Sequence, residues 1–171
     1  MIDEKQLFII AVAVLGFLAL QLRKRRNILM CMFAANSAFC MHYLLNPSLS
    51  GVLMNVMNGL RNLLYAQRDE YKPLRTKALP YIFSVVVLII GVIVWDGPLT
   101  VLFIVGNIVS CFGLRCRHTT NIRKSILISC PLLAVYEFFG GTVIGGCYEL
   151  LLIVSAIVSL VRYRNSGKHR K

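Results

Sequence analysis

Seven long apolar runs, separated by short polar segments, dominate this chain of 171 residues. A segment inside a lipid bilayer must satisfy its backbone N–H and C=O groups internally, and a helix needs about 20 apolar residues to cross about 30 Å of hydrocarbon. We therefore predict an all-α integral membrane protein with seven transmembrane helices. The predicted spans are residues 7–22, 28–45, 49–66, 79–95, 99–114, 125–139 and 143–161.

The composition agrees with this class, because 57% of the residues are hydrophobic and only 15% are charged. Soluble domains carry about 25% charged residues, so a water-facing surface over most of the chain is excluded. The first apolar run has its basic cluster, residues 23–26, after it rather than before it. This order indicates a retained helix and not a cleaved signal peptide.

The formal net charge is +12, and the positions of the Lys and Arg residues indicate the membrane topology. Seven spans place most of the 19 Lys and Arg on one side of the membrane, in the segments 23–26, 68–77, 115–124 and 162–171. The positive-inside rule assigns that side to the cytoplasm, so we predict an N-terminus outside and a cytoplasmic C-terminus. A nucleic-acid site would gather basic residues on one groove with aromatic partners, so nucleic acid is not an expected partner.

The two halves of the chain align with each other. Residues 22–28 match residues 114–122 with two extra residues in the second copy, and the register then places Gly51 on Gly145 and Asn55 on Glu149. Parallel repeats joined by one helix occur among transporters. We predict parallel 3+1+3 repeats: a first three-helix repeat at 1–68, a loop and linking helix at 69–97, a second repeat at 98–164 and a basic tail at 165–171.

Asparagines follow one face of the predicted helix at 49–66. At about 100° per residue, Asn55, Asn58 and Asn62 share a stripe, and Arg61 flanks it. Amides are costly to expose to lipid, so this stripe must face protein or a wet cavity. Interhelical hydrogen bonds that lock the bundle are one interpretation. We favour a polar cavity, because locking needs fewer polar groups than this stripe contains.

Glu149 lies deep in the predicted membrane, about 9 Å along its helix from Val143 at the usual rise per residue. Such a carboxylate must be protonated, paired or in contact with water. We expect it to form the wall opposite the asparagines, with Arg61 as its counter-charge or as a partner for an anion. Glu137, near a helix end, is equally compatible with a charge that reaches water. Further candidates for the lining are Asn36, Cys40, Tyr43, Asn107, Cys111, Tyr136, Tyr148 and His42, the last with a packed core role as the alternative.

The sequence carries no signature of catalysis or of metal binding. Its six Cys show no Cys-x-x-Cys spacing. Cys40 and His42 are two residues apart on a helix and point in different directions, which disfavours a metal site with Glu149. Phosphate-binding glycine loops, zinc-protease helices and serine nucleophile elbows are missing from the sequence. We therefore expect no enzymatic activity, no cofactor and no metal site.

Several of these residues also resemble a known family. The segments 42–45 and 58–61, together with the glycines at 51, 140, 141, 145 and 146 and Glu149, are similar to bacterial inner-membrane proteins of the YgjV type. This resemblance implies a multi-pass protein of the bacterial inner (cytoplasmic) membrane. More distantly, the plan looks like the SWEET, PQ-loop and PnuC-like transporters. Leu20 stands where a PQ-loop proline would precede Gln21, and Pro131 is the only proline placed in the middle of a predicted helix.

Taken together, the repeat, the asparagines and Glu149 favour a small transporter or facilitator that moves a polar small molecule through a central cavity. The alternative is a structural or binding membrane protein whose polar groups only lock the bundle. The expected partners are the lipid bilayer and an unidentified polar solute, and the sequence leaves a homo-oligomer open.

Overall fold

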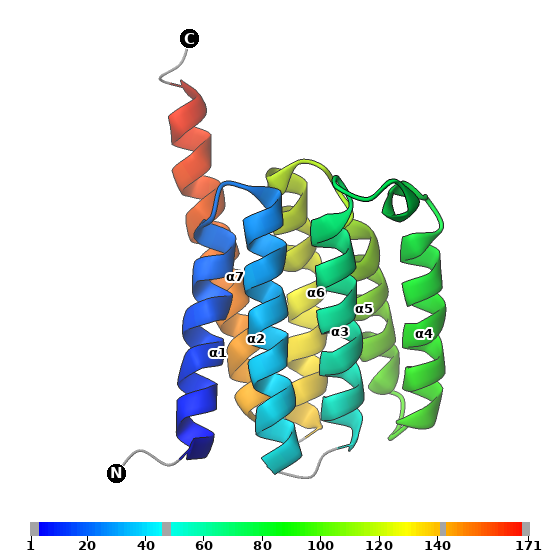
Figure 1. The fold of residues 1–171 in the computed structure, drawn as a ribbon. Coiled ribbons are helices and arrows are strands. Elements are labelled where there is room, and N and C mark those ends of the chain that lie inside the picture. Colours follow the sequence, from blue (N-terminus) through cyan, green and yellow to red (C-terminus); the bar gives the residue numbers. More distant parts are fainter. Residues whose placement is uncertain (1–3, 46–48, 141–142, 169–171) are drawn as a thin grey trace.

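Seven α-helices and one short 3-10 helix form the part of the chain that the computed structural model describes, residues 4–45, 49–140 and 143–168. The bounds are α1 Glu4–Gln21, α2 Arg25–Leu45, α3 Leu49–Gln67, η1 Lys72–Arg75, α4 Leu79–Ile93, α5 Thr100–Gly113, α6 Thr119–Phe139 and α7 Val143–Lys168. The α-helices run side by side along one axis and reverse direction at each connection (Figure 1). The all-α prediction is confirmed, and each predicted span corresponds to one α-helix.

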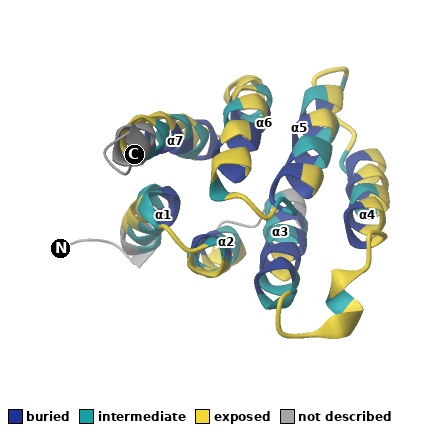
Figure 2. Cartoon of the chain, turned by 90° about the horizontal axis from the view of Figure 1, so that it is seen from above, coloured by how far each residue is buried: buried dark blue, intermediate teal, exposed yellow. Residues whose placement is uncertain are grey.

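The helices form two facing rows with one helix outside them. In the view along the axis, α1, α2 and α3 make one row and α7, α6 and α5 make the other (Figure 2). Each helix packs against its sequence neighbour within a row, and α1 packs against α7 across the rows. The linking helix α4 packs on α5 and touches α3. The interior between the rows is therefore closed by α1 and α7 on one side and bordered by α4 on the other.

Three local features differ from the sequence prediction. α6 begins at Thr119, well before residue 125, and α7 continues to Lys168 through part of the predicted basic tail. The 3-10 turn Lys72–Arg75 was not predicted. Both extensions carry Lys and Arg, whose charged ends reach water while the helix continues past its apolar run.

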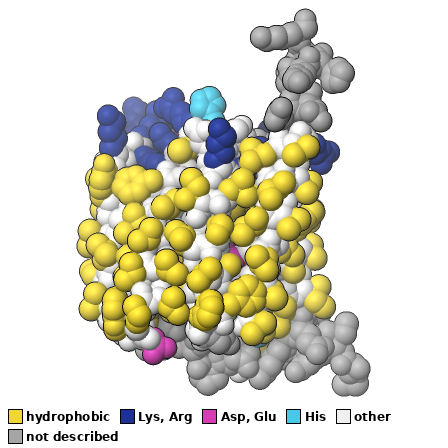
Figure 3. Space-filling view, turned by 180° about the vertical axis from the view of Figure 1, so that it is seen from behind, with side chains coloured by type: hydrophobic (Ala, Val, Ile, Leu, Met, Phe, Trp, Pro, Cys, Tyr) yellow, Lys and Arg dark blue, Asp and Glu magenta, His cyan; other side chains and the backbone are white. Residues whose placement is uncertain are grey.

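The outside of the bundle is apolar between the helix ends. On α4, the side chains of Ile82, Val85, Ile89 and Val92 are all more than half exposed. Figure 3 shows hydrophobic side chains across one whole face, with Lys and Arg gathered at a single end. A contiguous apolar surface of this extent is typical of membrane proteins and rare in soluble monomers.

Two of the described helices combine the length and the apolar composition of a membrane span, three are apolar but shorter, and α3 and α6 belong to neither group. By length and composition alone, Arg25–Leu45 and Val143–Tyr163 are long and apolar enough to cross a membrane. Phe8–Gln21, α4 and α5 are apolar but shorter. The 15 residues of α4 extend about 22 Å at 1.5 Å per residue, so a local thinning of the bilayer would have to accommodate it.

Two arginines satisfy carbonyl groups at the end of the bundle where the α1–α2, α3–α4 and α5–α6 connections lie, which we call the basic end (Figure 1). The last carbonyls of a helix have no partner within it. Arg123 of α6 donates to the Leu20 and Leu22 oxygens at the end of α1, at 3.1 and 2.8 Å. Arg25 of α2 donates to the Tyr65 oxygen in the last turn of α3 and to the Cys116 oxygen just after α5, at 2.9 and 3.0 Å. Each arginine therefore ties its own row to the opposite one.

A second set of hydrogen bonds fastens α1 to α7. The Gln21 amide donates to both the backbone oxygen and the hydroxyl of Ser155, at 3.1 and 3.0 Å. The Ser155 hydroxyl donates to the Phe17 oxygen, and the Tyr163 hydroxyl donates to the Gln21 oxygen. Gln21 therefore connects the two rows.

Replacement of Arg123 by Met should destabilise the bundle. The side chain is 2% exposed, so the substitution leaves buried carbonyls of α1 without donors and should lower the free energy of unfolding by about 2–4 kcal/mol. Denaturant titration in detergent, followed by circular dichroism, measures the change. Lys124→Met at the exposed neighbouring position is the control, with an expected change below about 0.5 kcal/mol. Equal stability of the two variants would contradict the capping role of Arg123.

Candidate functional site

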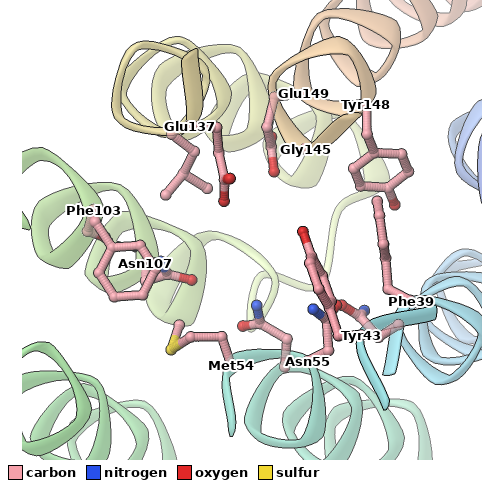
Figure 4. Close-up of a pocket in the computed structure, with 13 residues that line it drawn as sticks. Phe39, Tyr43, Met54, Asn55, Phe103, Asn107, Glu137, Gly145, Tyr148 and Glu149 are labelled. Atoms are coloured by element: carbon pink, nitrogen blue, oxygen red, sulfur yellow. Dashed lines mark hydrogen bonds between the residues drawn. The ribbon is translucent and has the colours of Figure 1, made fainter. Parts of the chain in front are cut away.

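A cavity of about 80 Å³ lies between the two rows of helices. It is bounded by α2 and α3 from one row and by α5, α6 and α7 from the other (Figure 4). The lining residues are Asn36, Phe39, Tyr43, Met54, Asn55, Asn58, Phe103, Asn107, Leu133, Glu137, Gly145, Tyr148 and Glu149. A cavity needs about 10–15 Å³ of accessible volume to hold one water molecule, so this space suits several waters or one small solute.

Helical spacing brings these side chains to the cavity. Asn55 and Asn58 are three residues apart on α3, and Phe103 and Asn107 are four apart on α5, so each pair shares one helix face. Gly145 and Glu149 are related in the same way on α7. The predicted stripe on α3 therefore does face a cavity at two of its three asparagines.

The amides of three lining asparagines are bonded within their own helices. The Nδ2 groups of Asn36, Asn55 and Asn107 donate to the carbonyl four residues earlier, at 2.7, 2.8 and 3.0 Å. This pattern differs from interhelical locking, in which the amides would bond across the rows. This bond uses one of the two N–H groups of each amide and holds the side chain against its own helix.

Two further oxygen atoms are buried without a hydrogen-bond partner in the described structure, Asn58 Oδ1 and Glu149 Oε2. The Glu149 carboxylate also meets the Cys130 thiol of α6. A buried acceptor without a donor is costly, so these atoms are suited to a ligand or to water that supplies hydrogen bonds.

Glu137 is a lining residue that the sequence analysis did not place at the site. Its carboxylate points into the cavity beside that of Glu149 (Figure 4). A Cβ atom added to Gly145 would lie 2.6 Å from Glu137 Oε2, so the glycine leaves room for the carboxylate. Likewise, a Cβ on Gly51 would lie 2.7 Å from the ring of Tyr43. The alignment of the halves sets Glu137 on Tyr43, and this was the signal that could have identified Glu137.

The structure distributes the predicted site residues unevenly. Asn36, Asn55, Asn58, Asn107 and Glu149 line the cavity, as do Tyr43 and Tyr148. The predicted residues that are not among the lining residues are Asn62, Arg61, His42, Tyr136, Cys40 and Cys111.

Arg61 and Asn62 are buried one turn nearer the basic end than Asn58. Arg61 Nη1 lies 3.6 Å from Cys111 Sγ, which places the guanidinium against α5. The ring of Tyr136 packs on Phe103 with centroids 4.9 Å apart, and the ring of buried His42 lies 5.5 Å from that of Tyr43. These four side chains surround the lining without forming its surface.

Within residues 4–45, 49–140 and 143–168, His, Cys, Asp and Glu side chains form no group of three or more that could hold a metal ion. The polar and aromatic groups of the lining are two carboxylates, four amides and four aromatic rings.

A family model described as a bacterial inner membrane protein, Imp-YgjV, matches residues 4–167. No curated protein and no solved structure matches the chain.

Asn55→Leu should leave the bundle at least as stable as the parent protein, because the Asn55 amide bonds within α3 and the leucine adds apolar contact. Tyr65→Phe is the comparison, since the Tyr65 hydroxyl donates across the rows to the Cys111 oxygen at 3.0 Å. Its loss should lower stability by about 1–2 kcal/mol. Thermal unfolding midpoints in detergent separate the two effects. A larger loss for Asn55→Leu would favour interhelical locking.

Proposed function

We propose that this chain, which belongs to the YgjV family of bacterial inner membrane proteins, moves a small polar solute across the membrane through the cavity between its two rows of helices. The observation that carries the proposal is a cavity lined by carboxylate and amide groups inside a bundle whose exterior is apolar. Polar groups at such positions are costly and by default mark a route or a site for a polar ligand.

The lining supports an internal repeat, because equivalent positions of the two halves meet at the cavity. The register that places Gly51 on Gly145 also places four lining residues of the first half on lining residues of the second half. The pairs are Phe39 with Leu133, Tyr43 with Glu137, Met54 with Tyr148 and Asn55 with Glu149. A cavity at the junction of two repeats is where transporters built from repeats bind their substrates.

The rows also carry reciprocal arginine contacts. Arg25 of α2 caps the end of α5, and Arg123 of α6 caps the end of α1. Arg25 and Arg123 are not aligned positions, but in the aligned halves α2 corresponds to α6 and α1 to α5, so equivalent helix pairs are joined in both directions. This reciprocity supports the arrangement of two three-helix units with α4 as the link, the plan that resembles the SWEET-like transporters.

The position of the cavity along the bundle suggests how the solute would pass. Tyr43 and Glu137 lie in the last turns of α2 and α6, so the cavity reaches toward the end of the bundle opposite the basic end. Toward the basic end the interior is packed, with Leu20, Tyr65, Leu114 and Ile122 in the buried core. Passage to the basic side therefore requires the two rows to separate there, which breaks the Arg25 and Arg123 contacts.

We place the basic end in the cytoplasm, because loops rich in Lys and Arg remain on that side. The N-terminus then lies outside, the C-terminus lies in the cytoplasm, and the cavity is closer to the outer surface. In this orientation the described conformation is closed toward the cytoplasm.

Transport should depend on the lining polar groups. With the protein in proteoliposomes and a panel of sugars, nucleosides, amino acids and amines, we expect uptake of one solute class that Asn58→Leu and Glu149→Gln reduce by at least about tenfold. Glu70→Gln and Asn27→Leu, matched changes at exposed positions, should leave the flux unchanged. Flux that ignores both cavity substitutions would show that the cavity is not the route.

The orientation can be tested separately. A fluorescent protein fused after Lys171 should be active, whereas alkaline phosphatase at the same position should be inactive, because the phosphatase folds only outside the cytoplasm. The same pair of fusions at the 46–48 connection should give the opposite result. A phosphatase active at the C-terminus would reverse the proposed orientation.

A further inference from the structure

The ionisable side chains that line the cavity are acidic. Glu137 and Glu149 project into it from α6 and α7 (Figure 4), and Lys, Arg and His are absent from the thirteen residues of its lining. The buried cation that the sequence placed at the site, Arg61, lies outside the lining and against Cys111. A lining with two acidic side chains and no basic one favours a positively charged ligand and disfavours an anion.

The lining also offers buried hydrogen-bond acceptors. Asn36, Asn55 and Asn107 each use one Nδ2 N–H to donate to a carbonyl of their own helix. Asn58 Oδ1 and Glu149 Oε2 are buried without a partner in the described structure. These two oxygens match a ligand that donates hydrogen bonds.

Aromatic rings complete the walls. Phe39, Tyr43, Phe103 and Tyr148 all line the cavity, and Phe39 meets Tyr148 edge to face with centroids 4.8 Å apart. Ring faces attract organic cations and also cover apolar carbon atoms. A ligand with an alkyl part beside its charge therefore suits this lining better than a strongly hydrated metal ion does.

From these features we propose that the cavity selects small organic cations that carry a protonated amine. The carboxylate of Glu149 pairs with the ammonium group, Glu137 adds a second negative charge, and asparagine oxygens accept the remaining N–H bonds. The cavity volume of about 80 Å³ suits a small ligand. The inference rests on the proposed function for the role of the site in transport, but binding of the cation does not require transport.

Binding of ethylammonium chloride to the full chain in lipid nanodiscs tests this inference. Isothermal titration calorimetry should show saturable binding of ethylammonium, with no saturable binding of ethanol or sodium acetate, which have similar size but neutral or negative charge. Sodium chloride at the same concentration controls for ionic strength.

Three variants connect binding to the named residues. Glu149→Gln keeps the shape of the side chain and removes its charge, so affinity for ethylammonium should fall by at least about tenfold. Gly145→Ala should also weaken binding, because the new Cβ would displace the flexible Glu137 carboxylate while helix packing is retained. Glu70→Gln, at an exposed acidic residue, should bind as the parent protein does. Circular dichroism of each variant verifies that it is folded.

The outcomes are distinct. Absence of saturable ethylammonium binding, tighter binding of ethanol or acetate, or binding that both Glu149→Gln and Gly145→Ala leave unchanged would each overturn the cation site. Cation binding without any flux in proteoliposomes would count against transport while supporting the site. Uptake of a neutral solute that Asn58→Leu abolishes and ethylammonium does not inhibit would support transport and overturn the cation site.

Discussion

The pairing of polar groups in apolar surroundings is the constraint on which the rest of this structure depends. Helices satisfy their own backbone except at their ends, where the last carbonyls need donors from elsewhere. Arg25 and Arg123 supply such donors. Arg25 donates to a carbonyl of its own row and to one of the facing row, and Arg123 donates to carbonyls of the facing row. The same interactions that solve this local problem therefore fix how the two rows approach each other at the basic end.

Polar groups in the cavity, at the other end of the interior, also need partners, but there the amides bond within their own helices. Three asparagines at the cavity each donate one N–H to a carbonyl of their own helix rather than across the rows. Asn58 Oδ1 and Glu149 Oε2 are buried there without a partner in the described structure. These acceptors, in a lining whose charged side chains are two glutamates, motivate the proposed preference for cations that donate hydrogen bonds.

The arrangement of the rows explains why single positions from distant parts of the chain meet. The halves pack face to face, so a residue on α3 and its aligned position on α7 approach the same central space, as Asn55 and Glu149 do. The glycines at 51 and 145 have matching roles, since each gives room to a larger side chain, Tyr43 or Glu137, from the preceding helix. These correspondences extend a weak sequence alignment with contacts that the alignment did not use.

The sequence by itself determined the seven helices, their alternation and the concentration of Lys and Arg at one end, because these follow from the lengths of apolar runs and the positions of charges. It also indicated seven of the lining residues, through polar side chains within the predicted spans. Only the tertiary structure decided that Arg61 and Asn62 lie outside the cavity and that Glu137 lies on it. Periodicity within one helix fixes which residues share a face, whereas the depth and partner of each face depend on how neighbouring helices pack, and that packing is set by contacts between residues far apart in the chain.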